Sequence, residues 1–285
     1  MYDEPQYFTL KIGVCFCRCD VRVNDIPLFT YDVSGSRIDV ELPLNQHVFT
    51  GENMLSFRLL PAQASDQAPS YGLDNGHVEC SVELIRRPYG RETGERTVLA
   101  SMVYRGGDVD PFAASSVEAP GVSPVQTAFE AREHALAART VQLVTDFPEW
   151  RWVRAPAIEP SPVVIRELLA EHQRFWTALR NKDVAELRSL MAASAREMQS
   201  AYYLRDLEEA HRVIGVEALL RNPEASLKPM PTDLKLEVFA NGRMARLVDA
   251  TGDSPIYFHE ADTGLDAYLG AWFCRAATGA WVMIR

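Results

Sequence analysis

Three cysteines at alternate positions, Cys15, Cys17 and Cys19, form the densest group of reactive side chains in the sequence. On one extended strand they would share a face, where thiolates could bind a soft metal ion. Consecutive same-face residues on a strand are about 7 Å apart, too far for tetrahedral coordination unless the strand bends. Because buried free cysteine is common, we predict that these thiols pack in a core and that the chain has no metal-ligating residues.

The sequence lacks the motifs that would name a reaction. It contains no G-x-G-x-x-G or Walker A phosphate-binding motif, no G-x-S-x-G nucleophile motif, and no H-E-x-x-H or C-x-x-C metal motif. These absences predict that the protein has no cofactor. They favour a non-catalytic protein and leave an enzyme without these motifs as the alternative.

Two further candidates for chemistry have simpler structural interpretations. His172 lies within an apolar helical stripe, where a lone histidine is more often a hydrogen-bonded core residue than a catalyst. Trp150 and Trp152 could stack on a sugar or a base, but between Pro148 and Pro156 we expect them to anchor the chain to a sheet. Neither feature is predicted to be a site.

The composition is typical of a folded protein in a reducing compartment. The 285 residues exceed the usual size of one domain and predict two. The five cysteines are an odd number, and a chain of this length needs no disulfides to fold. No apolar run is long enough for a membrane span, and the first residues, MYDEPQYFTL, lack the features of a signal peptide. We therefore expect a cytoplasmic protein.

The net charge of −10 limits the classes of partner. Nucleic acids and anionic membranes both require a basic face, so neither is predicted to bind. Residues 1–119 contain 10 Lys and Arg against 17 Asp and Glu, so the acidic excess is concentrated there. The charge favours another protein as the partner, one with a basic surface that meets the first domain.

The elements that would position these side chains change type along the chain. Residues 6–104 show period-two patterning with about seven strands, and Asn24 and Asp25 form a hairpin turn. This pattern predicts an antiparallel β-sandwich over residues 1–105. The stretch IDVELPLNQHVFTGENMLSFRLLP resembles the strand–turn–strand segment of galactose-binding-like β-sandwich domains.

The second half of the chain begins with helical patterning. Residues 106–124, rich in Gly, Pro, Ser and Ala, are predicted to be a linker, with a second domain over residues 125–285. Helices are expected within residues 126–220, the first over 126–144. Ser161 with Pro162 marks the start of the next helix, and a capping box at Asp183 starts the third.

Residues 233–285 return to period two and predict an antiparallel meander. The expected fold class is therefore α+β multidomain: an N-terminal antiparallel β-sandwich followed by an α+β domain with helices packed on a curved antiparallel sheet. This order of elements, with the helical segment FWTALRNKDVAELRSLM, resembles the cone-shaped fold of the nuclear-transport-factor-like superfamily, which includes ketosteroid-isomerase-like enzymes.

The resemblance implies a pocket between sheet and helices, with Tyr, Asp or His side chains inside. The candidates here are Tyr202, Tyr257, His259 and Asp262. An Asp base with a Tyr donor could support isomerase or dehydratase chemistry. Spacing does not place these residues together, however, and Tyr257 and His259 share a strand face that is either core or solvent. We favour structural roles for them and predict no catalytic residues.

Two functional hypotheses follow. The first is a non-catalytic protein-binding module, such as a bacterial immunity protein that neutralises an antibacterial toxin in the producing cell. The alternative is a small-molecule-binding protein, or an isomerase-like or dehydratase-like enzyme, that uses a pocket in the C-terminal domain. Carbohydrate recognition by the first domain is a third and weaker reading, because no secretion signal is seen.

Overall fold

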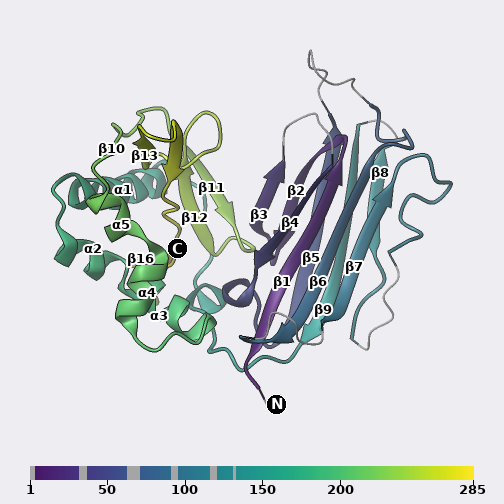
Figure 1. The fold of residues 1–285 in the computed structure, drawn as a ribbon, viewed down its shortest axis with the longest axis horizontal. Helices are drawn as coiled ribbons and strands as arrows, with labels where there is room; N and C mark the ends of the chain where they lie inside the picture. The colour runs from purple at the N-terminus through teal and green to yellow at the C-terminus, as the bar shows by residue number, and fades with distance from the viewer. Residues whose placement is uncertain (1–3, 32–36, 63–70, 91–95, 116–120, 131–132) are drawn as a thin grey trace. The chain divides into compact units, whose positions relative to one another are not determined.

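The computed structural model describes residues 4–31, 37–62, 71–90, 96–115, 121–130 and 133–285. These residues form a mixed α and β structure with five α-helices and four antiparallel sheets. The chain divides into two compact units, Met1–Pro148 and Glu149–Arg285 (Figure 1). Within the described residues, no helix combines the length and the apolar character that a membrane crossing needs.

The first unit is built from strands. Its elements are β1 (Gln6–Cys15), β2 (Cys17–Val23), β3 (Ile26–Tyr31), β4 (Ile38–Pro43), the 3₁₀ helix η1 (Asn45–His47), β5 (Gly51–Pro61), β6 (Glu79–Pro88), β7 (Thr97–Arg105), β8 (Gln126–Glu130) and β9 (His134–Leu143). One sheet has the order β4-β1-β6-β7 and the other β3-β2-β5-β9-β8. Side chains from both sheets meet in one core, which includes Phe8, Leu10, Phe57 and Tyr104.

The turn between β2 and β3 follows the sequence prediction. Asn24 and Asp25 both have positive φ, at 54° and 61°, as a two-residue hairpin of the type I′ class requires. Asn24 is buried, donates through Nδ2 to the His47 carbonyl and the Asn53 side chain, and accepts through Oδ1 from the Met54 amide. The asparagine therefore forms the turn and also ties it to the neighbouring strand.

The helix expected over residues 126–144 is wrong, because this segment forms β8 and β9. β9 pairs with β5 along its length, from Gly51 opposite Leu143 to Leu59 opposite Ala135. Every second residue of β9, from Ala135 to Leu143, is buried. Alanine has a high intrinsic helix propensity. Here the pairing of β9 with β5 and β8 and the burial of its alternate side chains override that preference.

The linker expected at residues 106–124 is also corrected, because the division between the units falls after Pro148. Among the described residues of this segment, the Gly106 amide donates to the Val78 carbonyl and Phe112 contacts the Tyr104 ring edge-on, at 5.2 Å between centroids. Arg139 on β9 is buried and donates to the carbonyls of Ser101, Ser115 and Ser123. The segment thus belongs to the first unit; its residues 116–120 lie outside the described part.

The second unit combines helices with short strands. Its elements are the 3₁₀ helix η2 (Arg151–Arg154), α1 (Pro162–Arg180), α2 (Val184–Leu190), α3 (Ala192–Ala201), α4 (Leu207–Ile214), α5 (Val216–Arg221), β10 (Ala225–Leu227), β11 (Lys235–Phe239), β12 (Met244–Val248), β13 (Tyr257–Glu260), β14 (Leu265–Tyr268), β15 (Phe273–Arg275) and β16 (Trp281–Met283).

The predicted helix starts are confirmed. The Ser161 side chain accepts a hydrogen bond from the Val164 amide, with Pro162 in the first turn, and Asp183 accepts from the Glu186 amide. The helix ends differ more from expectation. The helix predicted to start at Asp183 is divided at Met191 into α2 and α3. Gly215, which has φ 83°, separates α4 from α5.

The single meander expected at the end of the chain is wrong, because its strands belong to two sheets. One sheet has the order β10-β13-β14 and the other β11-β12-β15-β16. The consecutive strands β14 and β15 thus lie in different sheets. Figure 1 shows the helices gathered on one side of the β11-β12 pair. Residues of α1, α2, α5, β12, β13 and β15 share one hydrophobic core.

Candidate functional site

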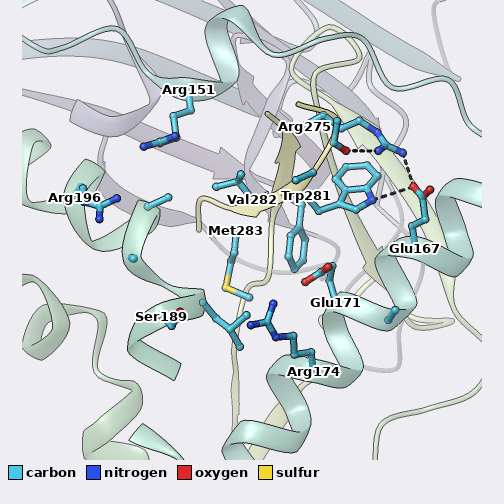
Figure 2. Close-up of a pocket in the computed structure, with 17 residues that line it drawn as sticks. Arg151, Glu167, Glu171, Arg174, Ser189, Arg196, Arg275, Trp281, Val282 and Met283 are labelled. Atoms are coloured by element: carbon cyan, nitrogen blue, oxygen red, sulfur yellow. Dashed lines mark hydrogen bonds and ion pairs between the residues drawn. The ribbon is translucent and has the colours of Figure 1, made fainter. Parts of the chain in front are cut away.

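The second unit contains a pocket of about 680 Å³, which we call the arginine pocket (Figure 2). Its walls are one side of α1, the α2–α3 corner, η2, and the strands β15 and β16. The lining residues are Arg151, Glu167, Ala170, Glu171, Arg174, Ser189, Leu190, Ala192, Ala193, Arg196, Phe273, Arg275, Gly279, Ala280, Trp281, Val282 and Met283. The volume falls within the usual range for ligand sites.

Four arginines from four different elements surround the pocket. Arg151 comes from η2, Arg174 from α1, Arg196 from α3 and Arg275 from β15. Two carboxylates, Glu167 and Glu171 of α1, also line it, so the lining carries an excess of positive charge. This excess contrasts with residues 149–285 as a whole, which contain 17 Lys and Arg against 19 Asp and Glu.

One wall of the pocket is fixed by a cluster of three side chains. Arg275 donates to Glu167 Oε2 and, at 2.6 Å, to the Gly279 carbonyl, and Trp281 Nε1 donates to the same Glu167 oxygen at 3.1 Å. The Arg275 guanidinium also lies over the Trp281 ring, 4.2 Å from its centroid. The hydrogen bonds from Arg275 and Trp281 lower the pKa of Glu167. Arg275 and Glu167 thus neutralise each other, and the indole is held in place.

The opposite wall presents cations without such partners. Figure 2 shows Arg151 and Arg196 on the side of the pocket away from Trp281. Both side chains are exposed, and neither has a hydrogen bond or ion-pair partner within the described part of the chain. Arg174 differs, because its Nε donates to Glu186 at 2.6 Å. The two unpaired guanidinium groups are therefore available to an external anion.

Apolar side chains line the pocket between these two walls. Phe273 and Met283 are buried, and Leu190 and Ala193 lie next to them along the lining. An apolar floor with guanidinium groups at its rim suits a ligand that carries carboxylate or phosphate groups, because arginine binds such groups through paired N–H donors. The arrangement can recognise an anion, with the carboxylate of Glu171 also in the lining.

The residues predicted from the sequence lie elsewhere in the second unit. Tyr257 and His259 are on β13 and Asp262 is in the turn after it, whereas Tyr202 is at the end of α3. The Tyr257 ring stacks on Tyr268 of β14 at 5.2 Å. The structure thus brings together three of the four candidates along one hairpin and leaves Tyr202 on a separate element. None of the four lines the arginine pocket.

His259 has a specific partner on this hairpin. Its Nδ1 lies 2.8 Å from Asp266 Oδ1, across the β13–β14 pair. Both side chains are more than one third exposed. The pair stabilises the hairpin on a solvent-facing surface, which accounts for its geometry without a ligand.

The three spaced cysteines do not share a strand face. β1 ends at Cys15, Phe16 takes a positive φ of 52°, and β2 begins at Cys17 in the other sheet. Cys17 and Cys19 are buried in the core, and burial raises the pKa of each to about 12. The described residues contain no group of three or more His, Cys, Asp or Glu side chains placed to hold a metal ion.

His172 and the two tryptophans are buried, as the sequence indicates. His172 is 1% exposed, its Nδ1 lies 2.8 Å from the Leu168 carbonyl, and burial lowers its pKa to about 4. The prediction of a hydrogen-bonded core histidine is confirmed. Trp150 and Trp152 are 1% and 3% exposed on either side of the first residue of η2.

A second pocket, of about 560 Å³, lies on the first unit, and its charged lining residues are Asp20, Arg22, Asp25 and Arg58. Arg22 pairs with Asp20 at 2.9 Å and with Asp25 at 3.1 Å. An anion that bound Arg22 would have to compete with these two carboxylates, whereas the guanidinium groups of Arg151 and Arg196 in the arginine pocket have no such partners in the described part of the chain.

Sequence reasoning missed the arginine pocket because its cations are far apart in the chain. Arg151 and Arg275 are separated by more than a hundred residues, and no short motif connects them. One signal was present: residues 149–285 contain 14 arginines and 3 lysines. Arginine is the residue preferred for paired hydrogen bonds to carboxylates and phosphates.

Comparison with family models, with curated proteins and with solved structures finds no match for this chain.

Proposed function

We propose that this protein is a non-catalytic binding protein and that the arginine pocket of its second unit holds an anionic group of the partner. The observation that carries the proposal is the pair of guanidinium groups, Arg151 and Arg196, that face the pocket without a partner in the described part of the chain. A guanidinium group beside apolar side chains can bind a carboxylate or phosphate through paired, charge-assisted hydrogen bonds.

The partner that we propose is another protein. The first unit supports this choice through its charge, because residues 1–148 contain 12 Lys and Arg against 20 Asp and Glu. Such a surface suits a basic region of the partner, while the arginine pocket suits an acidic one. A toxin neutralised by an immunity protein would be one partner of this kind.

The second candidate function is small-molecule binding in the same pocket, and its volume favours this alternative. An enzyme of the isomerase or dehydratase type would need an acid–base pair at the ligand, and Tyr202, Tyr257, His259 and Asp262 are not in the pocket lining. We therefore propose the small-molecule alternative as binding without catalysis.

Three structural proposals accompany this function. The shared core of the two first-unit sheets supports a β-sandwich. The succession of helices and antiparallel strands in the second unit supports a relationship to the cone-shaped nuclear-transport-factor-like fold, with two domains in all. Five free cysteines, four of them buried, support a cytoplasmic location.

Isothermal titration with inorganic phosphate, citrate and poly-L-glutamate tests the anion site. We expect saturable binding of at least one probe, and loss of that binding in the double variant Arg151→Glu/Arg196→Glu. The matched control is Lys235→Glu, which reverses an exposed charge on β11, at the far edge of the same sheet. An equal loss in both variants, or no binding of any probe by the unmodified protein, would contradict the proposal.

A further inference from the structure

The arginine pocket lies at an open edge of a sheet. β16 is the last strand in the order β11-β12-β15-β16, and within the described residues it pairs with β15 alone. An edge strand presents unpaired backbone N–H and C=O groups on its outer side, and these groups can pair with a strand of another chain.

The pairing pattern identifies which backbone groups face outward. The Ala276 amide donates to the Ala280 carbonyl, and the Ile284 amide donates to the Trp272 carbonyl. Val282 lies midway between these pairs, opposite Cys274, so its N–H and C=O also point to β15. Because bonding alternates along an antiparallel strand, the N–H and C=O of Trp281 and Met283 point away from β15.

The pocket is lined by every residue of β16. Successive side chains of a strand point to opposite faces of the sheet, so a cavity on one face alone would touch alternate residues. Gly279 and Ala280, which precede β16, and all three residues of β16, from Trp281 to Met283, line the arginine pocket. Because Val282 lines the pocket together with Trp281 and Met283, the pocket contacts β16 beyond the side chains of one face. On its other side it is bounded by α3, through Ala192, Ala193 and Arg196.

The charge beside this edge selects the kind of strand that would fit. Arg196 of α3 and Arg151 of η2 line the same pocket as the residues of β16, and their guanidinium groups have no partner in the described part of the chain. An added strand would place alternate side chains toward these guanidinium groups, where Asp or Glu would form charge-assisted hydrogen bonds. The remaining side chains would meet the apolar lining at Leu190 and Met283.

We propose that an extended, acidic segment of a partner protein adds to the free edge of β16 as a fifth strand of this sheet. The backbone groups of Trp281 and Met283 supply the affinity that does not depend on sequence, and Arg151 and Arg196 select acidic side chains. This inference rests on the anion-binding role proposed above and specifies the ligand as a β-strand rather than a free anion.

The test uses a synthetic peptide of alternating Glu and Val and two versions of it, one methylated on the Glu backbone nitrogens and one on the Val backbone nitrogens. Methylation preserves the charge of the peptide but removes alternate N–H donors. We expect the unmodified peptide to bind and one methylated version to bind at least about tenfold more weakly, a difference of about 1.4 kcal/mol.

Amide hydrogen exchange in the complex provides the second measurement. The amides of Trp281 and Met283 should gain protection when the unmodified peptide binds, while the Val282 amide, already bonded to β15, serves as the internal control. Equal binding of all three peptides, without protection of Trp281 and Met283, would overturn strand addition and leave the anion site intact. If no peptide binds, while phosphate or citrate still binds and Arg151→Glu/Arg196→Glu abolishes that binding, strand addition alone fails.

Discussion

Arg285 and Glu197 form an ion pair in which both side chains are more than nine-tenths buried, with 2.7 Å between Arg285 Nη1 and Glu197 Oε2. The other Glu197 oxygen accepts a hydrogen bond from the Arg151 amide. The carboxylate of α3 thus ties together η2, α3 and the residues after β16, and η2 and α3 both line the arginine pocket.

Substitution Glu197→Gln should lower the free energy of unfolding by about 3–5 kcal/mol, because it removes one charge of a buried ion pair. Urea denaturation followed by circular dichroism measures the change. The matched control is Glu208→Gln, which breaks the exposed Glu208–Arg188 pair and should cost much less, since solvent screens such pairs. Similar losses in the two variants would show that the buried pair contributes no more to the free energy of unfolding than the exposed pair does.

The stability of the second unit should fall as the pH drops below the ordinary pKa of histidine. In the folded protein burial lowers the pKa of His172 to about 4, from 6.5 when exposed. Between these values the unfolded chain binds a proton that the folded chain excludes, so stability is complete above about pH 6.5 and is lost progressively toward about pH 4. The full loss from this group is about 3 kcal/mol.

The comparison that isolates His172 uses the variant His172→Gln, which keeps a donor near the Leu168 carbonyl but does not titrate. Unfolding free energies at about pH 7 and pH 5 should differ less in the variant than in the unmodified protein. His211, whose pKa is also lowered by burial, contributes equally to both proteins. Identical pH dependence in the two would refute the assignment to His172.

Gly106→Ala should destabilise the first unit. A Cβ at Gly106 would lie 2.2 Å from the Asn75 carbonyl oxygen and 2.4 Å from that of Leu73, so backbone must move to admit it. We expect a loss of about 2–4 kcal/mol in the free energy of unfolding. Gly76→Ala is the control, because a Cβ there meets its nearest neighbour, the Gly106 carbonyl oxygen, at 3.8 Å. If Gly106→Ala does not lower the free energy of unfolding, residue 106 does not lie this close to the carbonyl oxygens of Leu73 and Asn75.

The cysteines should react with iodoacetamide in a defined order. Cys15 is half-buried, whereas Cys17, Cys19, Cys80 and Cys274 are buried. Burial raises the pKa of Cys17 and Cys19 to about 12 and that of Cys274 to about 11, so little thiolate forms. Mass spectrometry of the folded protein should show Cys15 modified first. Denaturation should expose all five, and early modification of Cys17 would contradict the described core.

Local signals in the sequence predicted the parts of the fold that local chemistry decides. Ser161 and Pro162 define the start of α1, and Asn24 with Asp25 defines the β2–β3 turn, because capping and positive φ depend on a few adjacent residues. β9 escaped prediction because its identity depends on pairing with β5, far away in sequence. Its buried alternation from Ala135 to Leu143 was present, but the alanines and charges resembled an amphipathic helix.

The arginine pocket depends on long-range contacts more than the fold does. Arg196 and Trp281 reach one pocket through the packing of α3 and β16, and no spacing in the sequence encodes that approach. The candidates that the sequence did single out, Tyr257 and His259, share a strand face as predicted but form cross-strand pairs with Tyr268 and Asp266. The sequence pattern identified the strand face that Tyr257 and His259 share, but not the residues opposite them on the neighbouring strand.

The place of β9 between β5 and β8 also governs how the first unit can assemble during synthesis. β5 is complete at Pro61, but its partner strand ends at Leu143, so one edge of β5 stays open until some eighty further residues have been made. Pairing between such distant segments is slow, and exposed strand edges invite association between chains. A fragment that ends near residue 105 would keep this edge permanently and lose the buried side chains of Ala135, Ala137 and Val141. The first unit should therefore fold as a whole through Pro148 or aggregate.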